Sequence, residues 1–128
     1  MLMLLLHLFG DYVIQSDMMA RYKSHSDPRI AWKWVSIHAV TYGLPFLFIG
    51  SWQAVLVIII THMIIDRYSL AKYVIYAKNR LWDKTLTFKT CQPFGYRENM
   101  PIHIAFWLYV IVDNTLHLTI NYLAIQYL

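Results

Sequence analysis

Residues 52–73, WQAVLVIIITHMIIDRYSLAKY, form a long apolar segment that decides the expected fold class. A helix needs about 20 residues of this kind to cross the hydrocarbon core of a bilayer. Three further segments have a similar length and composition, residues 1–19, 30–49 and 101–122. We therefore expect an all-α, polytopic membrane protein, a four-helix transmembrane bundle that forms a single domain over residues 1–128.

The composition supports this expectation. Hydrophobic residues make up 59% of the chain and charged residues 14%, which leaves too little polar surface for a soluble domain. The net charge of +4 does not indicate a nucleic-acid partner, because the basic residues lie in two segments between the expected helices. Cys91 is the only cysteine, so an intrachain disulfide and a thiolate zinc site are both excluded.

The positions of lysine and arginine predict the orientation, because short cytoplasmic loops carry the positive charge. The turn around Ser51 and the C-terminal tail carry none. We expect a location in the cytoplasmic (inner) membrane, with both termini facing away from the cytoplasm. The basic residues of the two cytoplasmic connections are Arg21, Lys23, Arg29 and Lys33, and then Lys72, Lys78, Arg80, Lys84, Lys89 and Arg97.

The connection between the third and fourth expected helices, residues 78–99, mixes aromatic and basic residues without helical periodicity. This pattern predicts a basic cytoplasmic loop at the membrane interface that anionic lipid attracts. The alternative is a lid that binds phosphate head groups. Arg80 and Lys84 in this loop, and Arg67 before it, are candidates to hold a substrate phosphate. An equally good interpretation of Arg67 is an arginine whose side chain extends to the membrane interface.

Histidine and aspartate occur four residues apart in three of the four apolar segments. Such pairs lie on one helix face, about 6 Å apart along the axis. Ionisable groups inside a bilayer are costly and mark candidate functional sites. In the expected orientation every pair places histidine outward and aspartate toward the cytoplasm, and a histidine of the remaining helix lies at a similar depth. The seven residues of this layer are His7, Asp11, His38, His62, Asp66, Asp113 and His117.

Four imidazoles and three carboxylates suit a divalent transition metal, zinc, manganese or iron, better than calcium. Seven groups exceed the four ligands of one zinc, so one ion with supporting carboxylates and two ions both fit. The alternatives are buried hydrogen bonds or ion pairs that hold the helices together, or a relay for protons or ions. Three pairs and a fourth histidine at one depth favour the metal site.

The motifs that contain these residues resemble those of a family of small bacterial and phage membrane proteins of unknown function, domain-of-unknown-function family 3307. The family pattern has H-x-x-G-D-aromatic-x-x-Q near the start, a histidine in mid-chain, H-x-x-I-D, and D-Q-x-x-H near the end. The matching residues are His7, Gly10, Asp11, Tyr12, Gln15, His38, His62, Ile65, Asp66, Asp113 and His117. Asn114 stands in place of the usual glutamine. The motif style is similar to that of membrane-bound proteins named as metal-dependent hydrolases, so the resemblance implies metal binding more than hydrolysis.

These patterns predict a metal-dependent integral membrane hydrolase. Its metal would activate water against a phosphoester or ester reached from the cytoplasmic side, either a lipid or a phosphorylated small molecule. One of three aspartates, Asp11, Asp66 or Asp113, would then act as the catalytic base.

Two other functions use the same pattern differently. A transporter or conduit for a proton, a metal ion or a small solute would place the polar layer at its central site, and four helices give it a wide enough path only as a homo-oligomer. A phage-type membrane scaffold or lesion protein accounts for the size and hydrophobicity but leaves the seven polar residues without a role.

Overall fold

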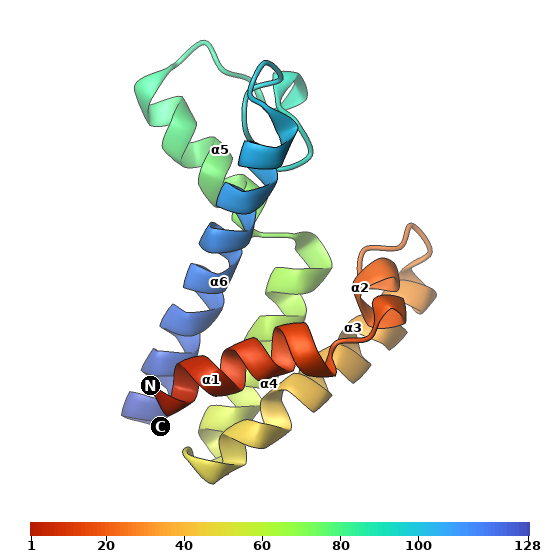
Figure 1. The fold of residues 1–128 in the computed structure, drawn as a ribbon, viewed down its shortest axis with the longest axis vertical. Helices are drawn as coiled ribbons and strands as arrows, with labels where there is room; N and C mark the ends of the chain where they lie inside the picture. Colours follow the sequence, from red (N-terminus) through yellow and green to blue (C-terminus); the bar gives the residue numbers. More distant parts are fainter. The chain divides into compact units, whose positions relative to one another are not determined.

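The structure, a computed structural model, describes all 128 residues and is built of helices (Figure 1). The expected all-α class is confirmed, with six α-helices in place of the four that the sequence predicts. The elements are α1 (Leu2–Leu8), the π-helix η1 (Phe9–Ile14), α2 (Asp17–Tyr22), α3 (Pro28–Gly43), the 3-10 helix η2 (Leu44–Phe48), α4 (Trp52–Tyr68), α5 (Ala71–Trp82), the 3-10 helix η3 (Phe88–Thr90) and α6 (Ile102–Tyr127).

The structure interrupts the long helices that hydropathy predicts. The helix expected over residues 1–19 breaks at Gln15, whose backbone is extended, before Ser16 caps α2. The helix expected over residues 52–73 ends at Tyr68, since Ser69 has a φ of 51°. Apolar composition sets the length of a hydrophobic segment but not the positions where its backbone turns.

Two other expected boundaries also change. The first residues of the expected loop 78–99 belong to α5, which the sequence analysis missed. The last helix continues to Tyr127, beyond the expected end of residues 101–122. No single helix meets the length and hydropathy criteria for a membrane span; α4 and α5 meet them only when taken together across their break.

The chain folds as two compact units, which we describe separately. Unit 1 consists of Met1–Tyr68 and His117–Leu128, and unit 2 consists of Ser69–Leu116.

The core of unit 1 lies between α3, α4 and the end of α6. Asp27 caps α3 by accepting a hydrogen bond from the Arg29 amide, and Pro28 occupies the first turn, where both residue types are favoured. The buried face of α4 contains Ile58 and, one turn further on, His62. The buried face of this helix therefore carries apolar residues first and the polar residues of the site one turn later. The core cluster consists of Tyr42, Phe46, Ala54, Val55, Ile58 and Ala124.

Gly10 in η1 lets the N-terminal segment approach α3 closely. A Cβ atom at this position would collide with the ring of Tyr42, which is fully buried. The close approach fixes η1 against α3, so that Asp11 lies next to the buried face of α3.

Unit 2 packs α5 and the first half of α6 against the loop between them. Its core cluster is formed by Ile75, Tyr96 and Ala105. Gly95 adopts a φ of 81°, in the left-handed region that favours glycine, and packs against the Lys72 carbonyl. This contact fixes the loop to the start of α5.

Candidate metal centre

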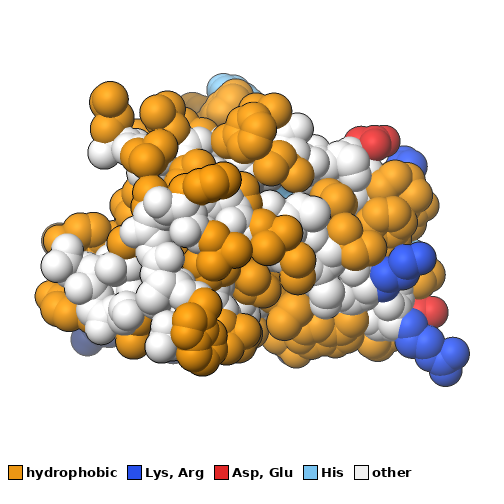
Figure 2. Space-filling model, turned by 90° about the horizontal axis from the view of Figure 1, so that it is seen from below, with side chains coloured by type: hydrophobic (Ala, Val, Ile, Leu, Met, Phe, Trp, Pro, Cys, Tyr) orange, Lys and Arg blue, Asp and Glu red, His pale blue; other side chains and the backbone are white.

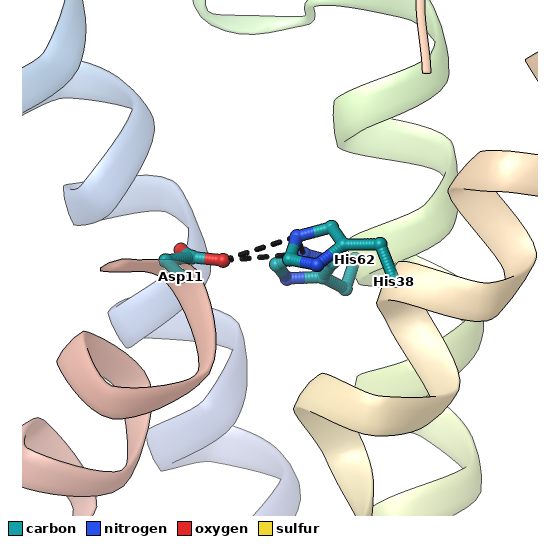
Figure 3. Close-up of side chains that lie close together, drawn as sticks. All are labelled: Asp11, His38 and His62. Atoms are coloured by element: carbon teal, nitrogen blue, oxygen red, sulfur yellow. Dashed lines mark hydrogen bonds and ion pairs between the residues drawn. The ribbon is translucent and has the colours of Figure 1, made fainter. Parts of the chain in front are cut away.

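Three side chains from three different elements of unit 1 converge on one point (Figure 3). Asp11 comes from η1, His38 from α3 and His62 from α4. The Nε2 atoms of the two histidines are 2.9 Å apart, and Asp11 Oδ1 lies 3.3 Å from His38 Nε2 and 3.5 Å from His62 Nε2. The three atoms thus form a nearly equilateral triangle.

The size of this triangle fits a single metal ion. Zinc binds imidazole nitrogen and carboxylate oxygen at about 2.0–2.2 Å, so two ligand atoms on one ion are about 3–3.5 Å apart. The separations among Asp11, His38 and His62 agree with this spacing. These residues therefore form a group that can hold a metal ion.

Asp66 lies against the same pair of histidines and extends the site. Its Oδ2 atom is 3.3 Å from His38 Nε2 and 3.4 Å from His62 Nε2, and its Oδ1 atom is 3.6 Å from His117 Nε2. His62, Asp66 and His117 form a second group with the spacing of metal ligands. The two groups share only His62, which is consistent with either one or two ions.

The site is almost closed to solvent. The four histidines of the cluster are no more than 1% exposed, Asp66 is 4% exposed and the Asp11 side chain is 13% exposed. The Nδ1 atoms of His38 and His62 are buried without a hydrogen-bond partner, so both rings present their interacting nitrogen, Nε2, to the cluster.

Lys23 contributes a positive charge that the sequence analysis did not assign to the site. Its Nζ atom lies 2.9 Å from Asp66 Oδ2, and its side chain is 25% exposed. A buried carboxylate requires such a partner, because an unpaired charge is costly away from water. Lys23 therefore links the segment after α2 to the buried cluster.

Tyr42 supports the cluster from the side of the core. Its hydroxyl group forms a hydrogen bond with His7 Nδ1 at 2.7 Å and accepts one from Asn121 Nδ2 at 2.6 Å. Its ring stacks on His62, with 3.8 Å between the ring centroids. His7 Nδ1 also lies 3.5 Å from Asp11 Oδ2. His7 therefore contacts Asp11 and Tyr42, while the other oxygen of Asp11 faces the histidine pair.

The structure brings together six of the seven residues expected in the layer. His7 adjoins the two metal-binding groups through Asp11 and is not a member of either. Asp113 precedes His117 by one turn of α6 but belongs to unit 2, and neither group includes it. Of the three phosphate candidates, Arg67 lies 5.8 Å from the Tyr68 ring in unit 1, whereas Arg80 and Lys84 belong to unit 2.

Sequence reasoning missed three residues of the site, and two of them carry a recognisable signal. Tyr42 follows His38 by four residues, and Asn121 follows His117 by four residues, so each extends a polar helix face by one turn. Lys23 has no such signal, because its pairing with Asp66 joins segments 43 residues apart.

Fold and site together define an all-helical protein with a buried histidine–aspartate cluster that can hold a metal ion. Residues 1–127 match the family described as "Protein of unknown function (DUF3307)", and the chain belongs to this family. No curated protein and no solved structure is similar enough to the chain to be matched.

Proposed function

We propose that this protein is an integral membrane hydrolase that depends on a divalent transition metal and acts on a phosphoester or ester reached from the cytoplasmic side. The observation that carries the proposal is the triangle of Asp11 Oδ1, His38 Nε2 and His62 Nε2. Three ligands leave at least one coordination position open, as catalytic zinc sites do. A divalent metal held there would lower the pKa of its bound water to near neutrality.

Other aspartates are candidates for the remaining roles in the proposed reaction. Asp66 is the proposed base, because its Oδ2 atom lies 3.3 Å from His38 Nε2 and 3.4 Å from His62 Nε2 and it is not one of the three ligands of the triangle. The proton of the attacking water would pass to Asp66 and then to the leaving oxygen. The new bond would form between the water oxygen and phosphorus or the acyl carbon as the bond to the leaving oxygen breaks. Asp113 is retained as a further candidate ligand or base.

The surface of unit 1 supports a location in the bilayer. Hydrophobic side chains are spread across the face drawn in Figure 2, and most of the lysine and arginine side chains visible there lie at one edge. On α1 and η1 alone, Leu2, Leu5, Tyr12 and Val13 are each more than half exposed. Apolar surface of this extent marks contact with another apolar phase. The interrupted helices fit the same location, since membrane proteins tolerate irregular backbone beside a polar site.

Metal content is the first test. The detergent-purified protein is expected to carry at least one zinc, manganese or iron ion per chain by elemental analysis, and His62→Ala should remove most of it. His103→Ala is the matched control, because His103 is exposed and lies outside the cluster. Less than about half an ion per chain that neither substitution changes would refute the metal site.

Turnover is the second test. The metal-loaded protein is expected to hydrolyse lipid phosphoesters or esters in detergent solution. Asp66→Asn should lower kcat by about 10²–10⁴-fold, the usual contribution of a general base. The triangle of Asp11, His38 and His62 does not include Asp66, so an ion held by the triangle should be retained, whereas an ion in the group of His62, Asp66 and His117 would be lost. Loss of the metal together with activity would show instead that Asp66 is a ligand.

Transport is a second candidate function, favoured by the interruption of the N-terminal helix beside the site. Asp11 lies in a π-helix, and the backbone leaves the helical conformation four residues later at Gln15. Transporters place binding sites at such broken helices. Metal-ion or proton flux in sealed vesicles, without any turnover in detergent, would support transport, with a homo-oligomer as the expected form.

A further inference from the structure

The outward side of α5 carries an apolar stripe. Val74, Ala77 and Leu81 are exposed and follow one another at intervals of three and four residues, so they share one helix face. Leu81 is 82% exposed and the adjacent Trp82 is 91% exposed. The opposite face packs inward through Ile75, which is fully buried. The stripe is therefore surface that the core of unit 2 does not use.

Unit 2 carries an excess of positive charge. Unit 2 contains six lysines and arginines against three acidic residues. Two of the lysines lie over aromatic rings, with Lys72 at 5.0 Å from the centre of Tyr73 and Lys78 at 5.6 Å from that of Tyr96. A helix with an exposed apolar stripe flanked by basic residues is typical of attachment to an anionic membrane surface.

An open pocket of about 500 Å³ lies beside the stripe, lined by residues that include Tyr76, Arg80, Leu81 and Lys84. The guanidinium group of Arg80 is fixed at its edge, because Nη1 donates to the Leu86 carbonyl at 2.6 Å and to the Tyr76 hydroxyl at 3.0 Å. Arginine has five N–H donors in a rigid fork, so the remaining donors can bind an anion. Lys84 adds a second charge to the same pocket.

Asp83, the acidic residue nearest to Arg80 and Lys84 in the sequence, binds other partners. Asp83 forms an ion pair with Arg97 and accepts hydrogen bonds from the backbone amide and hydroxyl of Thr85. No acidic residue lines the pocket. The charge of Arg80 and Lys84 is therefore available to a ligand.

From this arrangement we propose that the pocket binds the phosphate head group of an anionic phospholipid, while Leu81 and Trp82 enter the acyl region beside it. The two cations select an anionic head group by charge complementarity. The exposed apolar pair selects a lipid over free phosphate, because it gains from burial only when acyl chains are present. The site goes beyond the proposed hydrolase, since all its residues belong to unit 2.

Lipid titration of the full-length protein in detergent, read by native mass spectrometry, tests the proposal. The protein is expected to bind phosphatidylglycerol in preference to phosphatidylcholine. Arg80→Gln with Lys84→Gln should weaken phosphatidylglycerol binding about 30-fold, the effect of two cations near an anionic surface. The matched control is Arg29→Gln with Lys33→Gln, which removes the same charges from exposed positions of unit 1.

Three outcomes would overturn the proposal. The first is equal binding of the two lipids, and the second is an equal loss in the test and control variants. The third is displacement of phosphatidylglycerol by millimolar inorganic phosphate, which would assign the pocket to free phosphate. Leu81→Ser with Trp82→Ser should also weaken phosphatidylglycerol binding, and binding unchanged in that variant would contradict the acyl contact. The metal content of the Arg80/Lys84 variant should equal that of the wild type, so this proposal and the metal site can fail separately.

Discussion

Tyr42→Phe tests whether the hydroxyl group of Tyr42 supports the buried cluster. The substitution keeps the ring and its stacking on His62, and removes only the group that joins His7 to Asn121. Both partners are at most 2% exposed. A buried polar group that loses its partner costs about 1–3 kcal/mol. His7 retains Asp11 at 3.5 Å, so we expect a total loss of about 2–4 kcal/mol in the free energy of unfolding.

Reversible unfolding in detergent, followed by circular dichroism, measures this loss. Tyr122→Phe is the control, because Tyr122 is 53% exposed and lies on the same helix as Asn121. Asn121→Leu in the Tyr42→Phe background should add little, since the amide has already lost its partner. Metal affinity should fall about 10–100-fold, as for other residues that orient metal ligands. A loss below about 0.5 kcal/mol, or strict additivity of the two substitutions, would refute the reasoning.

Three further predictions concern Gly10, Lys23 and Cys91. Gly10→Ala should lower the unfolding free energy by about 1–3 kcal/mol, because its Cβ would collide with the ring of Tyr42; an unchanged unfolding midpoint would contradict the close approach. Lys23→Met should destabilise the metal-free protein by about 3–5 kcal/mol, because Asp66 is left buried without its ammonium partner. Added zinc should restore part of this loss. Equal unfolding midpoints of the variant with and without zinc would contradict the prediction. If the segment of Cys91 is cytoplasmic, an impermeant maleimide should label Cys91 in inverted but not in right-side-out membrane vesicles. Labelling at neutral pH should be slower than for an ordinary thiol, because burial raises the pKa of Cys91. Labelling only in right-side-out vesicles would reverse the proposed orientation.

The sequence predicts the chemistry of the site better than the course of the backbone. The spacing of four between His62 and Asp66 places both on one helix face, and the structure has both on the buried face of α4. The end of α4 at Tyr68 follows from the backbone conformation of Ser69, which no hydropathy pattern encodes. The helix α5 was missed because its buried residues, Ala71 and Ile75, are few and its outward face is also apolar.

The contribution of Asp11 shows why the first motif includes a glycine and why its helix changes type. One oxygen of Asp11 faces His7 in the preceding turn and the other faces His38 across the helix interface. This double contact requires η1 to lie against α3, and any side chain larger than hydrogen at Gly10 would prevent that approach. A π-helix rather than an α-helix carries Asp11, and such segments are rare and concentrate at functional sites. The glycine and the π-helix together therefore favour a site built to hold a ligand at the junction of η1, α3 and α4.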